Sequence, residues 1–112
     1  MCLFCKIVNR EIPGKILFED DDLLVFSDIR PMAPTHALVI PKRHITSLED
    51  APAGDAALLG KLMLACQRVA RDAGIATSGY RVVSNVGADG GQTVFHLHFH
   101  VLGGRAMTWP PG

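Results

Sequence analysis

Residues 94–102 read Val-Phe-His-Leu-His-Phe-His-Val-Leu, and from His96 onward a histidine alternates with an apolar residue. Successive side chains of a β-strand point to opposite faces, so the pattern predicts a strand over Val94–Leu102. His96, His98 and His100 would then share one face, with neighbours about 6.6 Å apart, because a strand rises about 3.3 Å per residue. The apolar residues between them would face the core.

The rest of the sequence predicts further strands and two helices. Apolar residues follow helical spacing over Asp55–Ala73, with Gly74 as the stop. A short helix is expected over residues 3–9. The other expected strands are Lys15–Glu19, Leu23–Ser27, Ala37–Ile40 and Tyr80–Asn85. Strands with short connections, one long helix and a final hairpin indicate an α+β fold with an antiparallel five-stranded sheet, covered on one face by the long helix.

Size and composition indicate a globular domain and argue against several partners. The 112 residues suit a single domain, 1–112, with 48% hydrophobic and 20% charged residues. No apolar run approaches the roughly 18 residues that span a membrane, and the N-terminus lacks the pattern of a signal peptide, so we expect a cytoplasmic protein. Eleven basic and eleven acidic residues balance, which makes nucleic acid a poor candidate as partner.

The three cysteines are Cys2, Cys5 and Cys66. An odd number without an export signal argues against a disulfide framework. Cys66 falls on the apolar face of the long helix, and we expect it to be a core residue. Cys2 and Cys5 form C-x-x-C, which is either a pair of metal ligands or a pair of small apolar residues.

Two kinds of chemistry suit three histidines on one strand face. H-x-H on a strand can ligate zinc. Alternatively, one imidazole attacks phosphorus while its neighbours donate protons or hydrogen bonds to the developing charge. The spacing alone does not decide between them. Several polar residues nearby suit a nucleotide: Asn85 as a hydrogen-bonding amide, Thr93 as a hydroxyl, and Asp28 either as a ribose acceptor or as a local cap.

The sequence resembles the histidine triad (HIT) family through His96-Leu97-His98-Phe99-His100-Val101-Leu102, which matches that family's H-x-H-x-H-x-x motif. Further segments are similar to the family's Hint branch: Asp28-Ile29, Ala33-Pro34-Thr35-His36, Val39-Ile40-Pro41-Lys42, Asp89-Gly90-Gly91-Gln92 and Trp109-Pro110-Pro111-Gly112. The resemblance covers nearly the whole chain in unbroken order. It implies a HIT-like fold and a homodimer whose sheet is continuous between subunits.

The resemblance also implies an activity, the hydrolysis of purine nucleoside 5'-phosphoramidates of the AMP or GMP type, which releases the nucleoside monophosphate and an amine. His98 matches the nucleophile, which forms a covalent nucleotidyl-histidine. His100 and His36 match assisting histidines. The implied substrate-binding positions, besides His98 and His100, are Phe26, Asp28, Ile29, Asn85, Gly91, Thr93 and, in the tail, Trp109.

No cofactor is implied for the reaction itself. Some members bind a structural zinc ion, at positions that match Cys2, Cys5, His44 and His96; two thiolates and two imidazoles make a closed tetrahedral site. Two alternatives to the phosphoramidase remain open at this point. One is a zinc-dependent hydrolase with the three histidines as ligands, and the other is a non-catalytic nucleotide-binding module.

Overall fold

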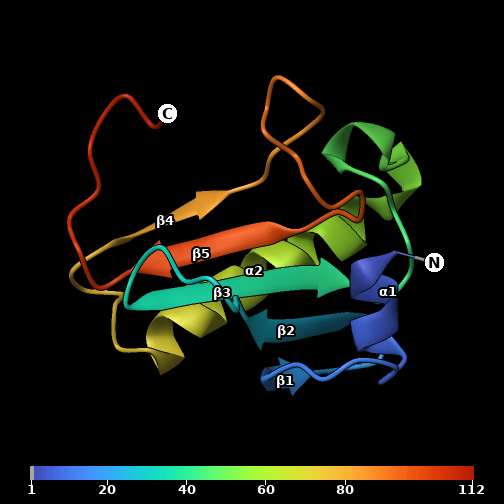
Figure 1. Ribbon diagram of the computed structural model, residues 1–112, viewed down its shortest axis with the longest axis horizontal. Coiled ribbons are helices and arrows are strands. Elements are labelled where there is room, and N and C mark those ends of the chain that lie inside the picture. The colour runs from blue at the N-terminus through green and yellow to red at the C-terminus, as the bar shows by residue number, and fades with distance from the viewer. Residues whose placement is uncertain (1) are drawn as a thin grey trace.

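The computed structural model describes residues 2–112, in which one antiparallel sheet lies between a long helix and a short helix (Figure 1). The sheet has the strand order β1-β2-β3-β5-β4. Its strands are β1 (Ile16–Glu19), β2 (Leu23–Ser27), β3 (Thr35–Pro41), β4 (Tyr80–Val83) and β5 (Phe99–Gly103). The helices are α1 (Leu3–Val8) and α2 (Ala56–Asp72), with short 3-10 helices at Leu48–Asp50 and Ala53–Asp55. The predicted α+β fold, its five-stranded antiparallel sheet and both helices are confirmed.

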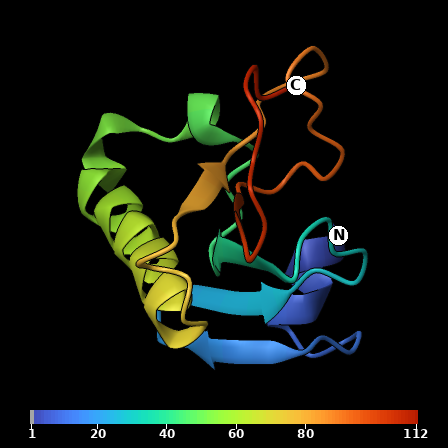
Figure 2. The same cartoon turned by 90° about the vertical axis from the view of Figure 1, so that its left-hand side faces the viewer.

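Helix α2 covers one face of the sheet (Figure 2). Its apolar stripe, which includes Leu62, Cys66 and Val69, is buried in one core cluster with side chains of β2, β3 and β5. Cys66 is therefore a core residue, as expected. The helix ends at Asp72, and the φ of 74° at Gly74, two residues later, lets the Ile75 N–H bond to the Ala70 carbonyl, closing a Schellman motif. No helix within residues 2–112 combines the length and the apolar character needed to cross a bilayer.

A second core cluster fills the opposite face of the sheet, under α1. Alternation along β2 sends Leu23 and Val25 to the α2 side and Leu24 and Phe26 to the α1 side. Leu38 of β3 also belongs to the α1 side and pairs directly with His100 of β5. Directly paired residues share a face, so His100 lies on the α1 side of the sheet.

Strand β5 begins at Phe99, so the expected strand over Val94–Leu102 is wrong in its first half. The segment before it leaves the ladder because the Leu97 N–H donates to the Ile45 carbonyl at 2.6 Å and the His98 ring bonds to the backbone two residues earlier. The three histidines therefore do not share one strand face, and the ring centroids of His98 and His100 are 5.0 Å apart. The intervening residues Leu97, Phe99 and Val101 are buried as expected.

Candidate active site

An open cleft of about 390 Å³ lies on the α1 side of the sheet, within the range of small-ligand sites. Its lining comes from the N-terminal segment, the end of β2 and the histidine run. Six of the predicted catalytic and substrate-binding residues line it: Phe26, Asp28, Ile29, Thr93, His98 and His100. Its apolar wall is mostly N-terminal, formed by Leu3, Phe4, Ile7, Ile12 and Pro13.

The protonation of His98 follows from its backbone contact. Its Nδ1 lies 2.7 Å from the carbonyl oxygen of His96, and a carbonyl only accepts, so Nδ1 must donate. In the neutral ring this leaves a lone pair on Nε2, the form that a nucleophile requires. The ring is 6% exposed and packs edge-on against Phe4, with centroids 5.1 Å apart. Burial lowers the pKa of His98 below its ordinary value, which keeps the ring neutral at pH 7.

His36 and His100 form a hydrogen-bonded pair with one defined pattern of protons. The Met32 N–H donates to His36 Nδ1 at 3.0 Å, so the neutral His36 ring carries its proton on Nε2. His36 Nε2 lies 2.9 Å from His100 Nδ1 and donates to it. His100 must then carry its own proton on Nε2, where it can donate to a bound ligand.

The carboxylate of Asp28 lies beside this pair, with Oδ2 3.4 Å from His36 Nε2. Burial lowers the pKa of His36, although Asp28 opposes the shift. Burial and the neighbouring His98 and His36 lower the pKa of His100 to about 4. Both rings are therefore neutral hydrogen-bond donors at neutral pH.

Two polar residues that sequence analysis did not single out for a role support the histidine run. The Ser84 hydroxyl donates to the His98 carbonyl at 2.9 Å. The buried Gln92 amide accepts from the Gly87 N–H at 2.9 Å and donates to the carbonyls of Thr46 at 2.8 Å and Val94 at 3.1 Å. Gln92 ends the segment Asp89-Gly90-Gly91-Gln92, but only the fold reveals that its side-chain amide joins three segments of the chain.

The four predicted metal ligands Cys2, Cys5, His44 and His96 come together, and their ligand atoms lie within 4.8 Å of one another. The His96 Nε2–H donates to the Pro41 carbonyl at 2.8 Å, which leaves Nδ1 as a free ligand atom. His96 Nδ1 is 3.3 Å from Cys2 Sγ and 3.2 Å from His44 Nδ1. A tetrahedron with Zn–S near 2.3 Å and Zn–N near 2.05 Å has edges of about 3.6 and 3.3 Å. The donor set therefore fits a zinc ion.

The surroundings of Cys5 favour its protonated form. Burial, and then the neighbouring Cys2 sulfur, raise the pKa of Cys5 to about 11. Cys5 would be protonated at neutral pH, and only a thiolate is an effective nucleophile. This raised pKa argues against Cys5 as a nucleophile.

A second group of potential ligands is formed by Asp28, His36 and His100, of which Asp28 and His100 line the cleft. Its protons argue against a metal there, because His36 Nδ1 already accepts the Met32 N–H and Nε2 holds the ring's proton. Nor do the three histidines of the run converge on one point, since His96 turns to the cysteines while His100 pairs with His36. This geometry disfavours a zinc hydrolase with the histidine run as its ligands.

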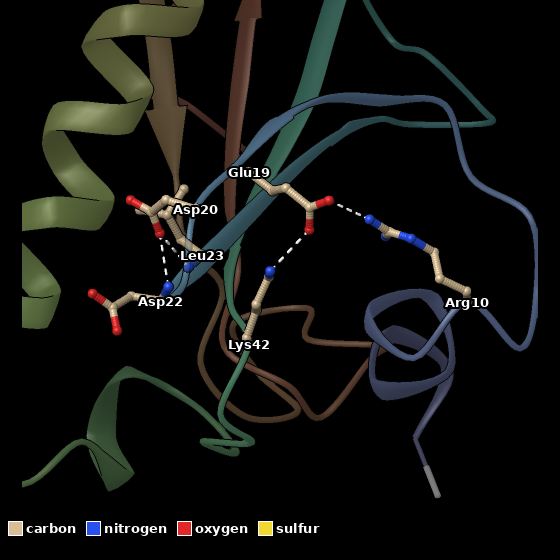
Figure 3. A network of polar contacts seen from close by, with 6 residues as sticks. All are labelled: Arg10, Glu19, Asp20, Asp22, Leu23 and Lys42. Atoms are coloured by element: carbon tan, nitrogen blue, oxygen red, sulfur yellow. Dashed lines mark hydrogen bonds and ion pairs between the residues drawn. The ribbon is translucent and has the colours of Figure 1, made fainter.

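The N-terminal segment carries both the cysteine pair and the apolar wall of the cleft, and salt bridges fasten it to the sheet. Figure 3 shows Glu19 of β1 between Arg10, just beyond α1, and Lys42, just beyond β3. The Lys42 Nζ lies 2.9 Å from Glu19. Exposed pairs of this kind contribute little individually, but these span three segments. They link the segment just after α1 to β1 and to the end of β3.

The remaining predicted site residues lie outside the cleft lining. Asn85 is half-buried two residues beyond β4, and Gly91, with φ of 81°, lies in the exposed turn before Gln92. Trp109 is 81% exposed in the C-terminal segment. Their roles in binding stay predictions.

Comparison with known proteins agrees with this geometry. The HIT domain family matches residues 9–107. An uncharacterized HIT-like protein of Synechococcus elongatus is 54% identical over 110 residues, which cover 98% of this chain and 96% of that protein. The crystal structure of a HIT family hydrolase from Legionella pneumophila is similar, with a TM-score of 0.98 and 51% identity over the full length of both chains. A histidine triad protein from Clostridium difficile has a TM-score of 0.92 and 43% identity, covering 96% of this chain and 93% of that one.

Proposed function

The chain belongs to the HIT family, and from that premise we propose that it hydrolyses purine nucleoside 5'-phosphoramidates of the AMP or GMP type. The observation that carries the proposal is the protonation of His98, whose Nδ1–H is committed to the His96 carbonyl. The Nε2 lone pair is then available in a ring that lines the cleft. Burial keeps that ring neutral, which a nitrogen nucleophile requires.

The reaction would proceed in two displacements at phosphorus. In the first, His98 Nε2 forms a bond to phosphorus while the P–N bond to the amine breaks, and the amine nitrogen takes a proton from solvent as it leaves. In the second, water attacks the nucleotidyl-histidine and loses a proton to solvent, which releases the nucleoside monophosphate and restores neutral His98. The His100 Nε2–H would donate a hydrogen bond to the phosphoryl oxygens and stabilise the charge that develops on them.

The polar and the apolar residues of the cleft would bind different parts of the nucleotide. The Asp28 carboxylate is suited to accept the ribose hydroxyls, and Thr93 offers a hydroxyl near the histidines. The apolar wall of Phe4, Ile7 and Phe26 would take the base. Apolar contacts discriminate weakly between similar bases, so adenosine and guanosine substrates should be used at comparable rates.

Replacement of His98 tests the proposal. His98→Ala should reduce turnover by several orders of magnitude while nucleotide binding survives, whereas Asp28→Ala should weaken binding. Mass spectrometry of quenched wild type should find a nucleotidyl adduct on His98. The substrates to compare are adenosine and guanosine phosphoramidates, a dinucleoside polyphosphate and a nucleotidyl sugar. Retention of more than a few per cent of activity in His98→Ala would refute the mechanism, and nucleotide binding without turnover in wild type would identify a binding module instead.

We also infer a structural zinc ion held by Cys2, Cys5, His44 and His96. The spacing of the ligand atoms and the free Nδ1 of His96 support it. The ion would tie α1 to the histidine run while catalysis needs no cofactor. Protein purified without chelators should contain about one zinc per chain. A strong chelator should lower the melting temperature of wild type but not of the Cys2→Ser, Cys5→Ser variant, and metal-free protein of unchanged stability would exclude the site.

We also propose that the protein is a homodimer. Strand β4 lies at an edge of the sheet, with Tyr80 38% exposed, and Trp109 is 81% exposed in the tail. An unpaired edge is a surface on which a second sheet can continue. Light scattering at micromolar concentration should give twice the chain mass, and a monomer there would refute the dimer. Deletion of residues 109–112 should alter substrate preference more than stability.

A further inference from the structure

The loop of residues 28–34 between β2 and β3 precedes His36 and is held by hydrogen bonds more than by packing. Met32 is 66% exposed and Ile29 is 89% exposed. Two of the bonds are internal to this connection: the Asp28 N–H donates to the His36 carbonyl, and the Arg30 N–H donates to Asp28 Oδ1 at 2.8 Å. Neither of them contacts the peptide groups of Met32.

Arg105 binds this loop from a distant part of the chain. Its Nε donates to the Met32 carbonyl at 2.9 Å, and its guanidinium also donates to the Ala106 carbonyl at 3.2 Å. The segment after β5 runs directly against the loop, since a Cβ on Gly104 would lie 2.9 Å from the Pro34 Cβ. The contact of Arg105 is therefore part of a close approach between the two segments.

Met32 is thus bound on both sides, through its carbonyl by Arg105 and through its N–H to His36 Nδ1. That N–H selects the Nε2–H tautomer of His36, and His36 in turn selects the Nε2–H tautomer of His100. If the backbone of Met32 moved away, His36 Nδ1 would lose the Met32 N–H as its hydrogen-bond donor. The ring could then take the other tautomer, whose Nε2 lone pair would face the His100 Nδ1 lone pair.

We propose that Arg105 is a positioning residue, which holds the Met32 carbonyl and thereby fixes the backbone of Met32, so that His36 and His100 keep the tautomers needed at the phosphoryl group. Arg105 itself does not line the cleft. Its effect on turnover rests on the proposed function, but its effect on the two rings does not. The proposal therefore has a readout that is independent of activity.

The test compares Arg105→Ala with Arg81→Ala. Arg81 is a matched control because its guanidinium also donates to a carbonyl of the C-terminal segment, that of Thr108 at 2.7 Å, without contacting the Met32 loop. Long-range ¹H–¹⁵N spectra of the imidazoles should show His36 as the Nε2–H tautomer in wild type and in Arg81→Ala. In Arg105→Ala the preference for this tautomer should fall about tenfold, because a hydrogen bond of ordinary strength is lost.

Kinetics provide the second readout. Arg105→Ala should lower kcat about tenfold with a smaller change in KM, because Asp28 keeps its own hydrogen bond to the His36 carbonyl. Arg105→Lys should recover part of kcat, because an ammonium can also donate to the Met32 carbonyl. An unchanged His36 tautomer in Arg105→Ala, or the same change in Arg81→Ala, would overturn the proposal. If wild type shows no turnover, the proposed function fails, and the spectra alone decide whether Arg105 positions the rings.

Discussion

Replacing Gln92 by alanine should lower the free energy of unfolding by about 2 kcal/mol. The side chain is 7% exposed and makes three hydrogen bonds, to Gly87, Thr46 and Val94. A typical bond contributes about 1 kcal/mol net, and a buried group left unpaired costs more. Thr46 is exposed and the other two residues are half-buried, so water can reach the freed groups, and the lower end of the range applies.

Chemical denaturation measures this loss, and for a domain of this size it corresponds to a fall in melting temperature of roughly 8 °C. Gln67→Ala is the matched control, because Gln67 is exposed on α2 and such substitutions usually change stability by less than about 0.5 kcal/mol. Because Thr93 follows Gln92 directly, kcat/KM should fall as well. If Gln92→Ala costs no more than Gln67→Ala, the turn before the histidine run is held by other contacts, and the reasoning fails.

Three further predictions concern stability. The folded-state pKa of His100 is about 4, below the ordinary value of 6.5, so the unfolded chain binds more protons between these two pH values and the free energy of unfolding should decrease as pH falls from about 6.5 to 4. His100→Asn should flatten this slope, which denaturation at several pH values measures. An equal slope in the variant would contradict the lowered pKa of His100. Gly60→Ala should stabilise the protein by about 0.5–1 kcal/mol, because Gly60 lies inside α2 and a Cβ there meets nothing within 4 Å. Gly103→Ala should destabilise the protein by about 1–3 kcal/mol, because a Cβ would lie 2.4 Å from Ile75 Cδ1. Thermal melts that rank Gly60→Ala below Gly103→Ala in stability would refute both of these predictions.

The sequence alone determined the main elements of the fold, because their signals are local. The apolar spacing over Asp55–Ala73 and the stop at Gly74 predicted α2 within one residue at each end. Alternation of apolar residues predicted correctly that Leu97, Phe99 and Val101 are buried. The resemblance carried by the histidine run identified the family and predicted four candidate metal ligands, whose ligand atoms lie within 4.8 Å of one another in the fold.

The positions and the tautomers of the histidine rings depend on the tertiary structure. Alternation predicts a strand wherever it occurs, but a strand also needs a partner. The Leu97 N–H bonds to the Ile45 carbonyl instead, so β5 begins at Phe99. The ring tautomers depend on the carbonyls of His96 and Pro41 and on the Met32 N–H. Main-chain groups are the same in every residue, so no sequence pattern records which of them faces an imidazole. That is settled only when the strands, the loop after β2 and the segment after β5 have packed together.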